Sequence, residues 1–216
     1  MVKQSLWVLG LLSLASACVN SNTPQATAPA GKPVASGNDG GTITQAGAWI
    51  IPSSVRGVVP ETALGVPSFS GVMNQDEVVV SSQALMGHFS VLWFYPFANT
   101  SGWTTEGLGF RDQANEFDAL ETSVFGVSFD AVDNNATFCD NNDFTYDLWS
   151  DLDRELAQYY GIVDSAAALF PSRQTVVLSP QGDWLLIYEN PSAPDGLGDH
   201  GRVVREDIEA IIAANE

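Results

Sequence analysis

Two apolar runs, each as long as a β-strand, constrain the fold of this chain more than any other feature. The first is Phe89–Tyr95, with the sequence FSVLWFY, and the second is Thr122–Phe129, with the sequence TSVFGVSF. Nearly continuous apolar runs of this length are typical of strands buried on both faces of a sheet. Between them, Thr104–Leu120 carries apolar residues at helical spacing. This order predicts two parallel central strands joined by a helix.

The rest of the folded part extends this pattern to an α/β sandwich. The expected elements are an extended lead-in at Trp49–Pro67, a β-rich run at Val78–Val80, a helical turn at Ser81–Gly87, a polar helix at Asn134–Asn142, strands at Gln174–Leu178 and Trp184–Tyr188 around the turn Ser179–Gly182, and a closing amphipathic helix at Glu206–Ala214. Ser150-x-x-Asp153 has the form of a capping box and predicts a further helix, which Gly161 ends. These elements predict a central mixed sheet flanked by helices, with an antiparallel hairpin at its edge.

The segment after the first central strand carries a recognisable motif. Tyr95–Asp112 reads YPFANTSGWTTEGLGFRD. It resembles the active-site segment of peroxiredoxins of the bacterioferritin-comigratory, or peroxiredoxin Q, type, whose pattern is YPxxxTxGCTxEACxFRD. The two cysteines of that pattern are absent: Trp103 stands at the position of the peroxidatic cysteine and Leu108 at that of the resolving cysteine. The chain therefore resembles a thiol peroxidase scaffold without its thiols.

The resemblance covers about Val66 to Ala213 and implies a thioredoxin-like fold. In that family the cysteine lies at a helix N-terminus, where N–H groups and a nearby arginine stabilise the thiolate. By motif, Pro96, Thr100 and Glu106 occupy their family positions, and Arg173 matches the family's arginine less specifically. Each also has a purely structural interpretation. Thr100 could satisfy backbone groups at the helix start, Arg173 and Glu106 could form an ion pair left by descent, and Pro96 could simply end a strand. An arginine beside a helix N-terminus could also hold a small anion, unless Trp103 blocks it.

Indole has one N–H donor and no nucleophilic group that ionises near neutral pH. Trp103 therefore cannot replace the thiol, and no catalytic residue is expected in this pocket. The alternative nucleophile is Cys139, whose flank ATFCDNND contains acidic residues and no basic ones. Nearby negative charge disfavours a thiolate, so a small buried apolar side chain is the preferred interpretation.

The N-terminus predicts export. Lys3 precedes the apolar stretch Leu6–Leu14, followed by Ala15-Ser16-Ala17-Cys18. Residues 1–17 are therefore expected to be a signal peptide. The sequence before Cys18 resembles a bacterial lipobox, which predicts lipidation of Cys18, and cleavage by ordinary signal peptidase is the alternative. Residues 18–42 would then be a lipidated cysteine and flexible tether, residues 43–65 an extended lead-in, and residues 66–216 the peroxiredoxin-like domain.

Charge and composition exclude several partners. The net charge is −18 with eight Lys and Arg, so nucleic acid is not an expected partner and a membrane would be contacted only through the lipid. No dinucleotide, phosphate-loop or metal motif is present, and no cofactor or metal is expected. His88 and His200 are expected to be exposed. The aspartates Asp130, Asp133, Asp140 and Asp143 fit no calcium-loop spacing and predict a solvated face.

Three functions remain open from the sequence. The first is an exported, lipid-anchored binding or interaction module that has lost the peroxidatic thiol. The second is a thiol-dependent peroxidase that uses Cys139, and the third is a structural surface domain without a ligand. The expected location is the bacterial cell envelope, in the outer membrane or periplasm of a Gram-negative cell, with a soluble secreted protein as the alternative. The partner is an unidentified protein or small ligand, and a homodimer is possible.

Overall fold

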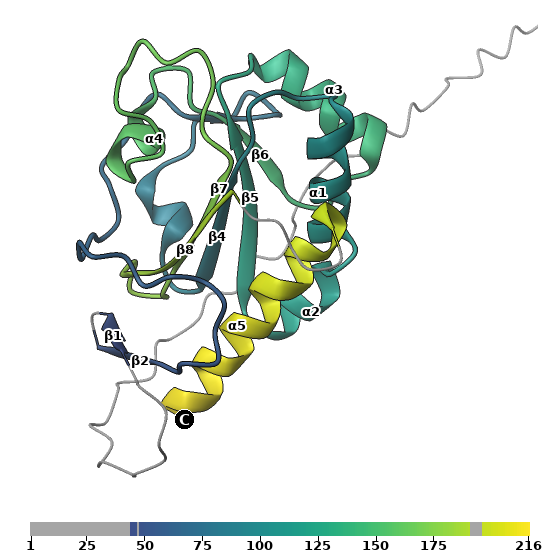
Figure 1. Cartoon of the computed structure of the whole chain (residues 1–216). Helices are drawn as coiled ribbons and strands as arrows, with labels where there is room; N and C mark the ends of the chain where they lie inside the picture. Colours follow the sequence, from purple (N-terminus) through teal and green to yellow (C-terminus); the bar gives the residue numbers. More distant parts are fainter. Residues whose placement is uncertain (1–43, 47, 191–195) are drawn as a thin grey trace, which may run out of the picture.

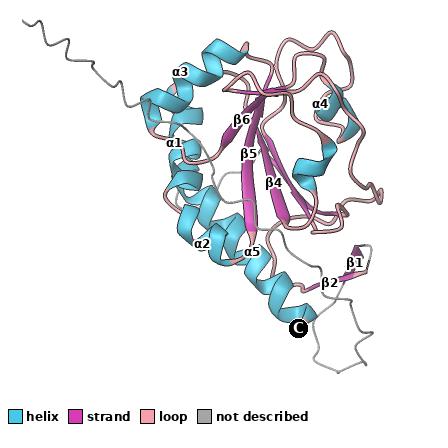
Figure 2. Cartoon of the chain, turned by 180° about the vertical axis from the view of Figure 1, so that it is seen from behind, coloured by secondary structure: helices cyan, strands magenta, loops and turns pink. Residues whose placement is uncertain are grey.

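A computed structural model describes residues 44–46, 48–190 and 196–216. These residues form a six-stranded mixed sheet with strand order β3-β6-β5-β4-β7-β8, and a separate pair of short strands, β1 and β2. Figure 1 shows helices α1, α2, α3 and α5 over one face of the sheet and α4 on the other. Figure 2 shows the same division from behind. The predicted sandwich, a mixed sheet flanked by helices, is confirmed.

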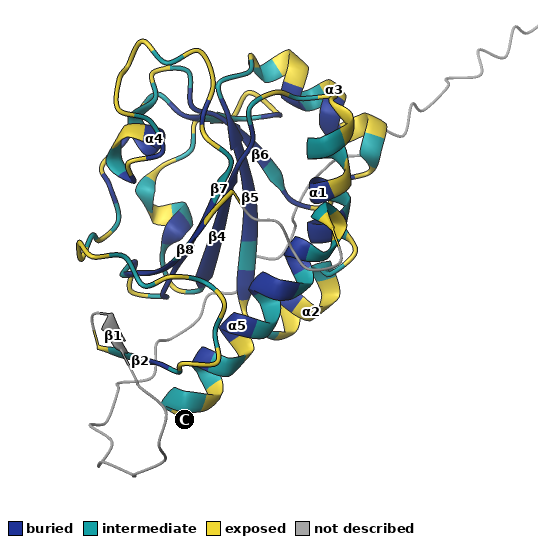
Figure 3. Cartoon of the chain, in the orientation of Figure 1, coloured by how far each residue is buried: buried dark blue, intermediate teal, exposed yellow. Residues whose placement is uncertain are grey.

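The sheet is built around the two strands expected at its centre. β4 (Phe89–Phe94) is buried along its whole length and runs parallel to β5 (Thr122–Ser128). On the other side β4 pairs antiparallel with β7 (Gln174–Leu178), which forms the predicted hairpin with β8 (Trp184–Glu189). A strand with neighbours on both sides and helices over both faces has no contact with water, and this accounts for the continuous apolar sequence of β4. Figure 3 shows the buried strands in dark blue.

Two hydrophobic cores lie on the two faces of the sheet. The described helical elements are η1 (Ser82–Leu85), α1 (Ser101–Arg111), α2 (Ala114–Ala119), α3 (Val132–Asn142), α4 (Glu155–Tyr159), η2 (Leu197–Asp199) and α5 (His200–Asn215). One core joins β4 to α1, α2, α3 and α5 through aromatic side chains such as Phe110, Phe117 and Phe138. The other places η1 and α4 against the opposite face, with Leu85 and Leu156 completely buried.

The single helix expected at Thr104–Leu120 is wrong, because the chain forms two. α1 ends at Arg111, and Asp112 and Gln113 turn the backbone before α2 begins. The Asp112 N–H still bonds to the Leu108 carbonyl, but Gln113 has φ −105° and ψ 11° and leaves the helical path. The bend allows Phe110 and Phe117 to stack at 6.2 Å in the same core. Core packing therefore overrides the continuous helical spacing.

The capping box at Ser150-x-x-Asp153 does not form. Ser150 instead ends a strand that sequence reasoning missed, β6 (Asp147–Ser150), which runs parallel to β5. The residue that caps α4 is Asp151, whose carboxylate accepts hydrogen bonds from the N–H groups of Leu156 and Ala157 at 3.3 and 2.9 Å. Four residues are too few for an alternating pattern to stand out, so β6 becomes evident only beside its neighbour. The end of α4 before Gly161, with φ +68°, is as expected.

Two further elements differ from expectation. At Val78–Val80, only Val79 forms a bridge, to Met73, and the strand of this region is β3 (Met73–Asn74), which pairs antiparallel with β6. The closing helix, expected at Glu206–Ala214, begins at His200 as α5.

The lead-in is packed against the domain. β1 (Thr44–Ala46) and β2 (Trp49–Ile51) pair antiparallel, and the Ile50 backbone exchanges hydrogen bonds with the Asn215 side chain at the end of α5. Farther on, Val58 and Ile187 exchange backbone hydrogen bonds of 2.9 and 2.8 Å along the outer edge of β8. The lead-in therefore covers part of an otherwise open sheet edge.

The predicted signal peptide at residues 1–17, the lipidated Cys18 and the tether to residue 42 lie outside the described residues. Among the helices that are described, none combines the length and apolar character needed to cross a membrane.

Candidate functional site

The motif of Tyr95–Asp112 lies where a central strand meets a helix. The segment leaves β4 at Tyr95, passes Pro96 and enters α1 at Ser101. The Asp130 carboxylate, beyond the end of the parallel strand β5, accepts a 2.9 Å hydrogen bond from the Ala98 N–H and holds this turn. Because parallel strands end at the same edge of a sheet, the topology places the N-terminus of α1 at a typical position for a site.

Thr100 is the residue before α1, with the extended backbone of a cap (φ −109°, ψ 145°). Its hydroxyl does not bond to the helix N–H groups but donates to the Phe97 carbonyl at 3.2 Å. Thr100 thus satisfies a backbone group just before α1, but it makes no side-chain cap to the helix N–H groups. The side chain is exposed, and no capping hydrogen bond ties it to α1.

Glu106 and Arg173 form a two-pronged ion pair beneath this turn. Arg173 Nε lies 3.0 Å from Glu106 Oε2, and a terminal guanidinium nitrogen lies 3.4 Å from Oε1. The side chains are 1% exposed for Glu106 and 14% for Arg173. The ion pair expected from the sequence is thus present in the structure. A planar guanidinium that meets a carboxylate in this way has fewer donors left for another anion.

Burial changes the protonation of Glu106. Removal from water raises the pKa of its carboxyl from 4.5 to about 7, while the hydrogen bonds and charge of Arg173 pull it down. Burial disfavours the charged form, and the single guanidinium offsets only part of that cost. Glu106 therefore titrates near neutral pH.

Trp103 covers the ion pair. The Arg173 guanidinium lies over the Trp103 ring, 5.5 Å from its centroid, in a cation–π contact. The indole is half-buried and packs against the core between the sheet and α1, as does Leu108. Trp103 and Leu108 thus both contribute apolar packing. Pro96, also half-buried, lies at the start of the same turn.

His200 belongs to this cluster, although the sequence suggested an exposed histidine. It is 1% exposed at the start of α5, and its Nε2 lies 2.9 Å from the Thr175 hydroxyl and 4.0 Å from Glu106 Oε1. Its ring meets Phe110 edge-on at 5.5 Å. Burial, followed by the charge of Arg173, lowers the pKa of His200 to about 3, so the ring is neutral at physiological pH.

The burial of His200 follows from a close helix contact. A Cβ atom on Gly109 would lie 2.2 Å from the Gly198 carbonyl, and one on Gly201 would lie 2.5 Å from the Gly109 carbonyl. These glycines allow the backbone of α1 to touch the start of α5. A sequence signal existed, since His200 lies four residues before Val204 and eight before Ile208 on the apolar side of α5. The glycines around His200 make this segment resemble a loop in the sequence, so the helical spacing was not recognised.

Cys139, the alternative nucleophile, lies outside this cluster. Its side chain is completely buried in α3, and its sulfur lies 3.6 Å from the Phe144 carbonyl oxygen. A completely buried sulfur is out of reach of a peroxide, and this opposes a role as the attacking thiolate.

The other charged candidates form no site. His88 was expected to be exposed but is half-buried at the start of β4, and burial lowers its pKa. The part of the chain that the structure describes contains no group of three or more His, Cys, Asp or Glu side chains that could hold a metal ion.

Comparison with known proteins places this arrangement in a family. Residues 64–183 match the family model described as the AhpC/TSA family. Peroxiredoxin Bcp of Xanthomonas campestris pv. campestris is 36% identical over 105 residues, which cover 46% of this chain and 66% of the relative. Chloroplastic peroxiredoxin Q of Arabidopsis thaliana is 30% identical over 162 residues, or 72% of this chain and 74% of the relative.

Other curated relatives are matched over a smaller share of their length, such as 61% for a bcp peroxiredoxin of Haemophilus influenzae. Among solved structures, the bacterioferritin comigratory protein of Xanthomonas campestris, studied for its alkyl peroxide reduction activity, superposes with a TM-score of 0.60 at 25% identity. That alignment covers 73% of this chain and 98% of the other. The sheet, the helices and the matched segment together show that this chain belongs to the AhpC/TSA family, with relatives of the Bcp and peroxiredoxin Q type.

Proposed function

We propose that this protein is an exported, lipid-anchored peroxiredoxin-like domain that does not reduce peroxide by the thiolate mechanism and acts as a binding or interaction module. The observation that carries the proposal is Trp103. The family reaction begins with attack of a thiolate on the peroxide, and an indole offers no equivalent nucleophile.

The surroundings of Trp103 support this conclusion. In the family, by the resemblance, an arginine stabilises the thiolate and polarises the peroxide. Here the Arg173 guanidinium is engaged by Glu106 at 3.0 Å and covered by the Trp103 ring. The group that would meet the substrate is therefore occupied on one side and shielded on the other. A small anion would have to displace one of these partners to reach it.

The competing possibility is a peroxidase that uses Cys139. The complete burial of its side chain opposes that role. The acidic sequence around it opposes the role too, since a thiolate is scarcer beside negative charge.

The proposal is tested by peroxide consumption in the presence of a thiol reductant. The purified protein, Cys139→Ser, Trp103→Cys and Trp103→Ser are compared at equal concentration. We expect the unaltered protein and Cys139→Ser to consume no peroxide beyond the buffer rate. Trp103→Cys restores a thiol at the N-terminus of α1 and is expected to gain activity, whereas the matched variant Trp103→Ser opens the same space without a thiol and stays inert.

The decisive contrary result is fast peroxide loss by the unaltered protein that disappears in Cys139→Ser. That pattern would assign the chemistry to Cys139 and make the protein a peroxidase. Equal activity in the unaltered protein and Cys139→Ser would point to a mechanism without any cysteine of the folded domain, and would equally overturn the proposal.

A further inference from the structure

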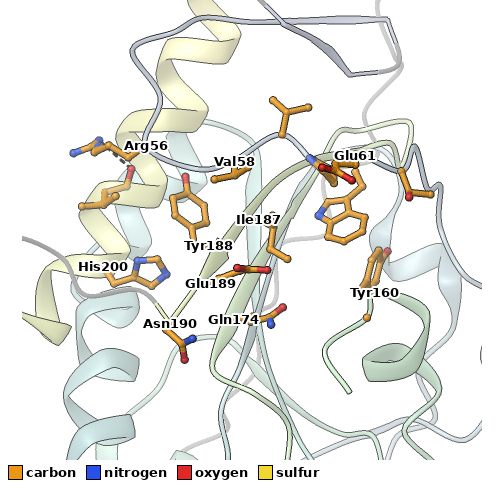
Figure 4. Close-up of a pocket in the computed structure, with 16 residues that line it drawn as sticks. Arg56, Val58, Glu61, Tyr160, Gln174, Ile187, Tyr188, Glu189, Asn190 and His200 are labelled. Carbon is orange, nitrogen blue, oxygen red and sulfur yellow. Dashed lines mark hydrogen bonds between the residues drawn. The ribbon is translucent and has the colours of Figure 1, made fainter. Parts of the chain in front are cut away.

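A large groove lies along the outer edge of β8, between this strand and the lead-in. Its volume is about 830 Å³, and Figure 4 shows side chains from both segments around it. Val58 and Ile187, which exchange backbone hydrogen bonds, form part of its apolar wall. His200 reaches the groove from the start of α5, so it lines this groove while also lying close to Glu106. The volume is that of a typical small-molecule site.

Buried polar atoms that line the groove have no partner. Tyr160 is 2% exposed, and its hydroxyl makes no hydrogen bond within the described residues. In Figure 4 this hydroxyl points toward the end of the groove at which Glu61 lies. The side-chain oxygen of Gln174 is also buried without a partner in the described part of the chain. Buried polar groups are normally satisfied, so an unpartnered pair beside one groove indicates that something else satisfies them.

The charges of the groove favour a cation. Glu61 and Glu189 are exposed on its rim, and neither forms an ion pair with another described residue. Arg56 also lines the groove, but its guanidinium is engaged by Asp207 at 3.1 Å and Glu206 at 2.8 Å. The carboxylates thus remain available while the arginine is neutralised. The whole chain, with a net charge of −18, reinforces attraction of a cation.

The aromatic side chains that line the groove favour a cation that also carries an aliphatic chain. Trp184, Tyr188 and Tyr160 line the groove, and the rings of Tyr160 and Trp184 meet edge-on with centroids 5.3 Å apart. Aromatic faces attract ammonium groups and also pack against methylene chains. Tyr188 keeps its own hydroxyl bound to Asp207 at 2.7 Å, so it contributes mainly an apolar surface.

We propose that this groove binds a linear aliphatic polyamine. Its ammonium groups would pair with Glu61 and Glu189, its N–H groups would donate to the Tyr160 hydroxyl and the Gln174 amide oxygen, and its methylene stem would lie along Val58, Ile187 and the aromatic rings. This inference goes beyond the proposed loss of peroxidase activity and stands independently of it, because the groove lies at the β8 edge and does not include Trp103.

The test is isothermal titration calorimetry of the purified protein with spermidine at physiological salt. We expect saturable one-to-one binding, weaker by about tenfold or more in the double variant Glu61→Gln with Glu189→Gln, since charge-assisted hydrogen bonds are lost. The matched control, Glu116→Gln with Asp140→Asn, removes the same charge from exposed positions outside the groove, and its affinity should stay within about twofold.

A second matched pair tests the buried hydroxyl without any change of charge. Tyr160→Phe is expected to weaken spermidine binding by roughly threefold to fivefold, because one hydrogen bond is lost, and Tyr159→Phe, on the neighbouring residue, is expected to leave it unchanged. Thermal melts of all variants show that each remains folded. Butylamine, with a single ammonium group, should bind much more weakly than spermidine.

Three results would overturn the proposal. The first is an absence of saturable spermidine binding. The second is an equal loss of spermidine affinity in the groove double variant and its control, which would show that spermidine is attracted only to surface charge. Tighter binding of a trilysine peptide than of spermidine would assign the groove to basic peptides instead. None of these results bears on the peroxide assay, so the two proposals fail separately.

Discussion

The buried carboxyl of Glu106 gives a prediction whose magnitude follows from the structure. Its pKa is about 7 in the folded protein, against 4.5 for the ordinary group. The folded state therefore binds this proton more tightly than the unfolded state, and between these two values the unfolded chain carries fewer protons. The free energy of unfolding then falls as the pH rises through this window. The contribution is complete below pH 4.5 and is lost above about pH 7.

The size of the effect follows from the two pKa values. At about 1.4 kcal/mol per pH unit, the whole contribution is about 3 kcal/mol, most of which is lost between pH 5 and pH 8. With a urea m-value of about 2–3 kcal/mol/M, this corresponds to a change of about 1 M in the urea midpoint. His200, whose pKa falls from 6.5 to about 3 on folding, acts in the opposite direction below pH 7, so the change is measured relative to Glu106→Gln, which keeps His200.

The measurement is urea unfolding of the unaltered protein and Glu106→Gln at pH 5, 6, 7 and 8. Glutamine keeps the shape of the side chain and can still accept a hydrogen bond from Arg173, but it does not titrate. The stability of the unaltered protein relative to Glu106→Gln should fall by about 2–3 kcal/mol from pH 5 to pH 8. Glu116→Gln, at an exposed position on α2, should show no such trend.

A difference between the two proteins that stays constant across this pH range would refute the reasoning. It would mean that the two-pronged contact with Arg173 compensates the burial of Glu106 completely. The carboxyl would then remain charged in both the folded and the unfolded states.

Two further predictions concern His200 and the anchor. Burial lowers the pKa of His200 from 6.5 to about 3, so on acidification the unfolded state takes up a proton before the folded state does. The free energy of unfolding should therefore fall by about 3 kcal/mol between pH 7 and pH 4 because of this residue. His200→Gln should remove that loss in acid unfolding curves, and an unchanged curve would show that the histidine becomes charged inside the fold. Glu106 changes the free energy of unfolding in the opposite direction over much of the same pH range. Each single variant should therefore show a dependence of stability on pH that largely cancels in the unaltered protein. For the anchor, the full chain expressed in a bacterium should be recovered with membranes and labelled by a fatty acid, whereas Cys18→Ser should be unlabelled; equal labelling of both would contradict lipidation of Cys18.

His200 lies between the groove and the ion pair that Glu106 forms with Arg173. His200 lines the groove while its Nε2 lies 4.0 Å from Glu106 Oε1, and Glu106 holds the arginine beneath Trp103. The ion pair beside Trp103 and the proposed polyamine groove therefore have His200 as a common neighbour. Glu106 and His200 form a buried polar pair at the contact between α1 and α5.

The sequence by itself determined the centre of the sheet and the position of the family motif. The apolar runs became β4 and β5, because a strand buried on both faces needs apolar side chains at every position. The motif located the start of α1, and the identities of Trp103 and Leu108 alone exclude a family thiol at those positions. The partnership of Glu106 with Arg173 was among the expected possibilities, since both residues match the family motif.

Only the tertiary structure decided which side chains are buried together. The break between α1 and α2, the short strand β6 and the burial of His200 depend on neighbours distant in sequence, which local periodicity does not report. His200 is the clearest case, because glycines that look like a flexible loop in the sequence allow α5 to touch α1 and close over the ring. The groove likewise exists only because the lead-in folds back along β8. Residue types set the available chemistry, and packing determined which groups meet and which remain exposed to water.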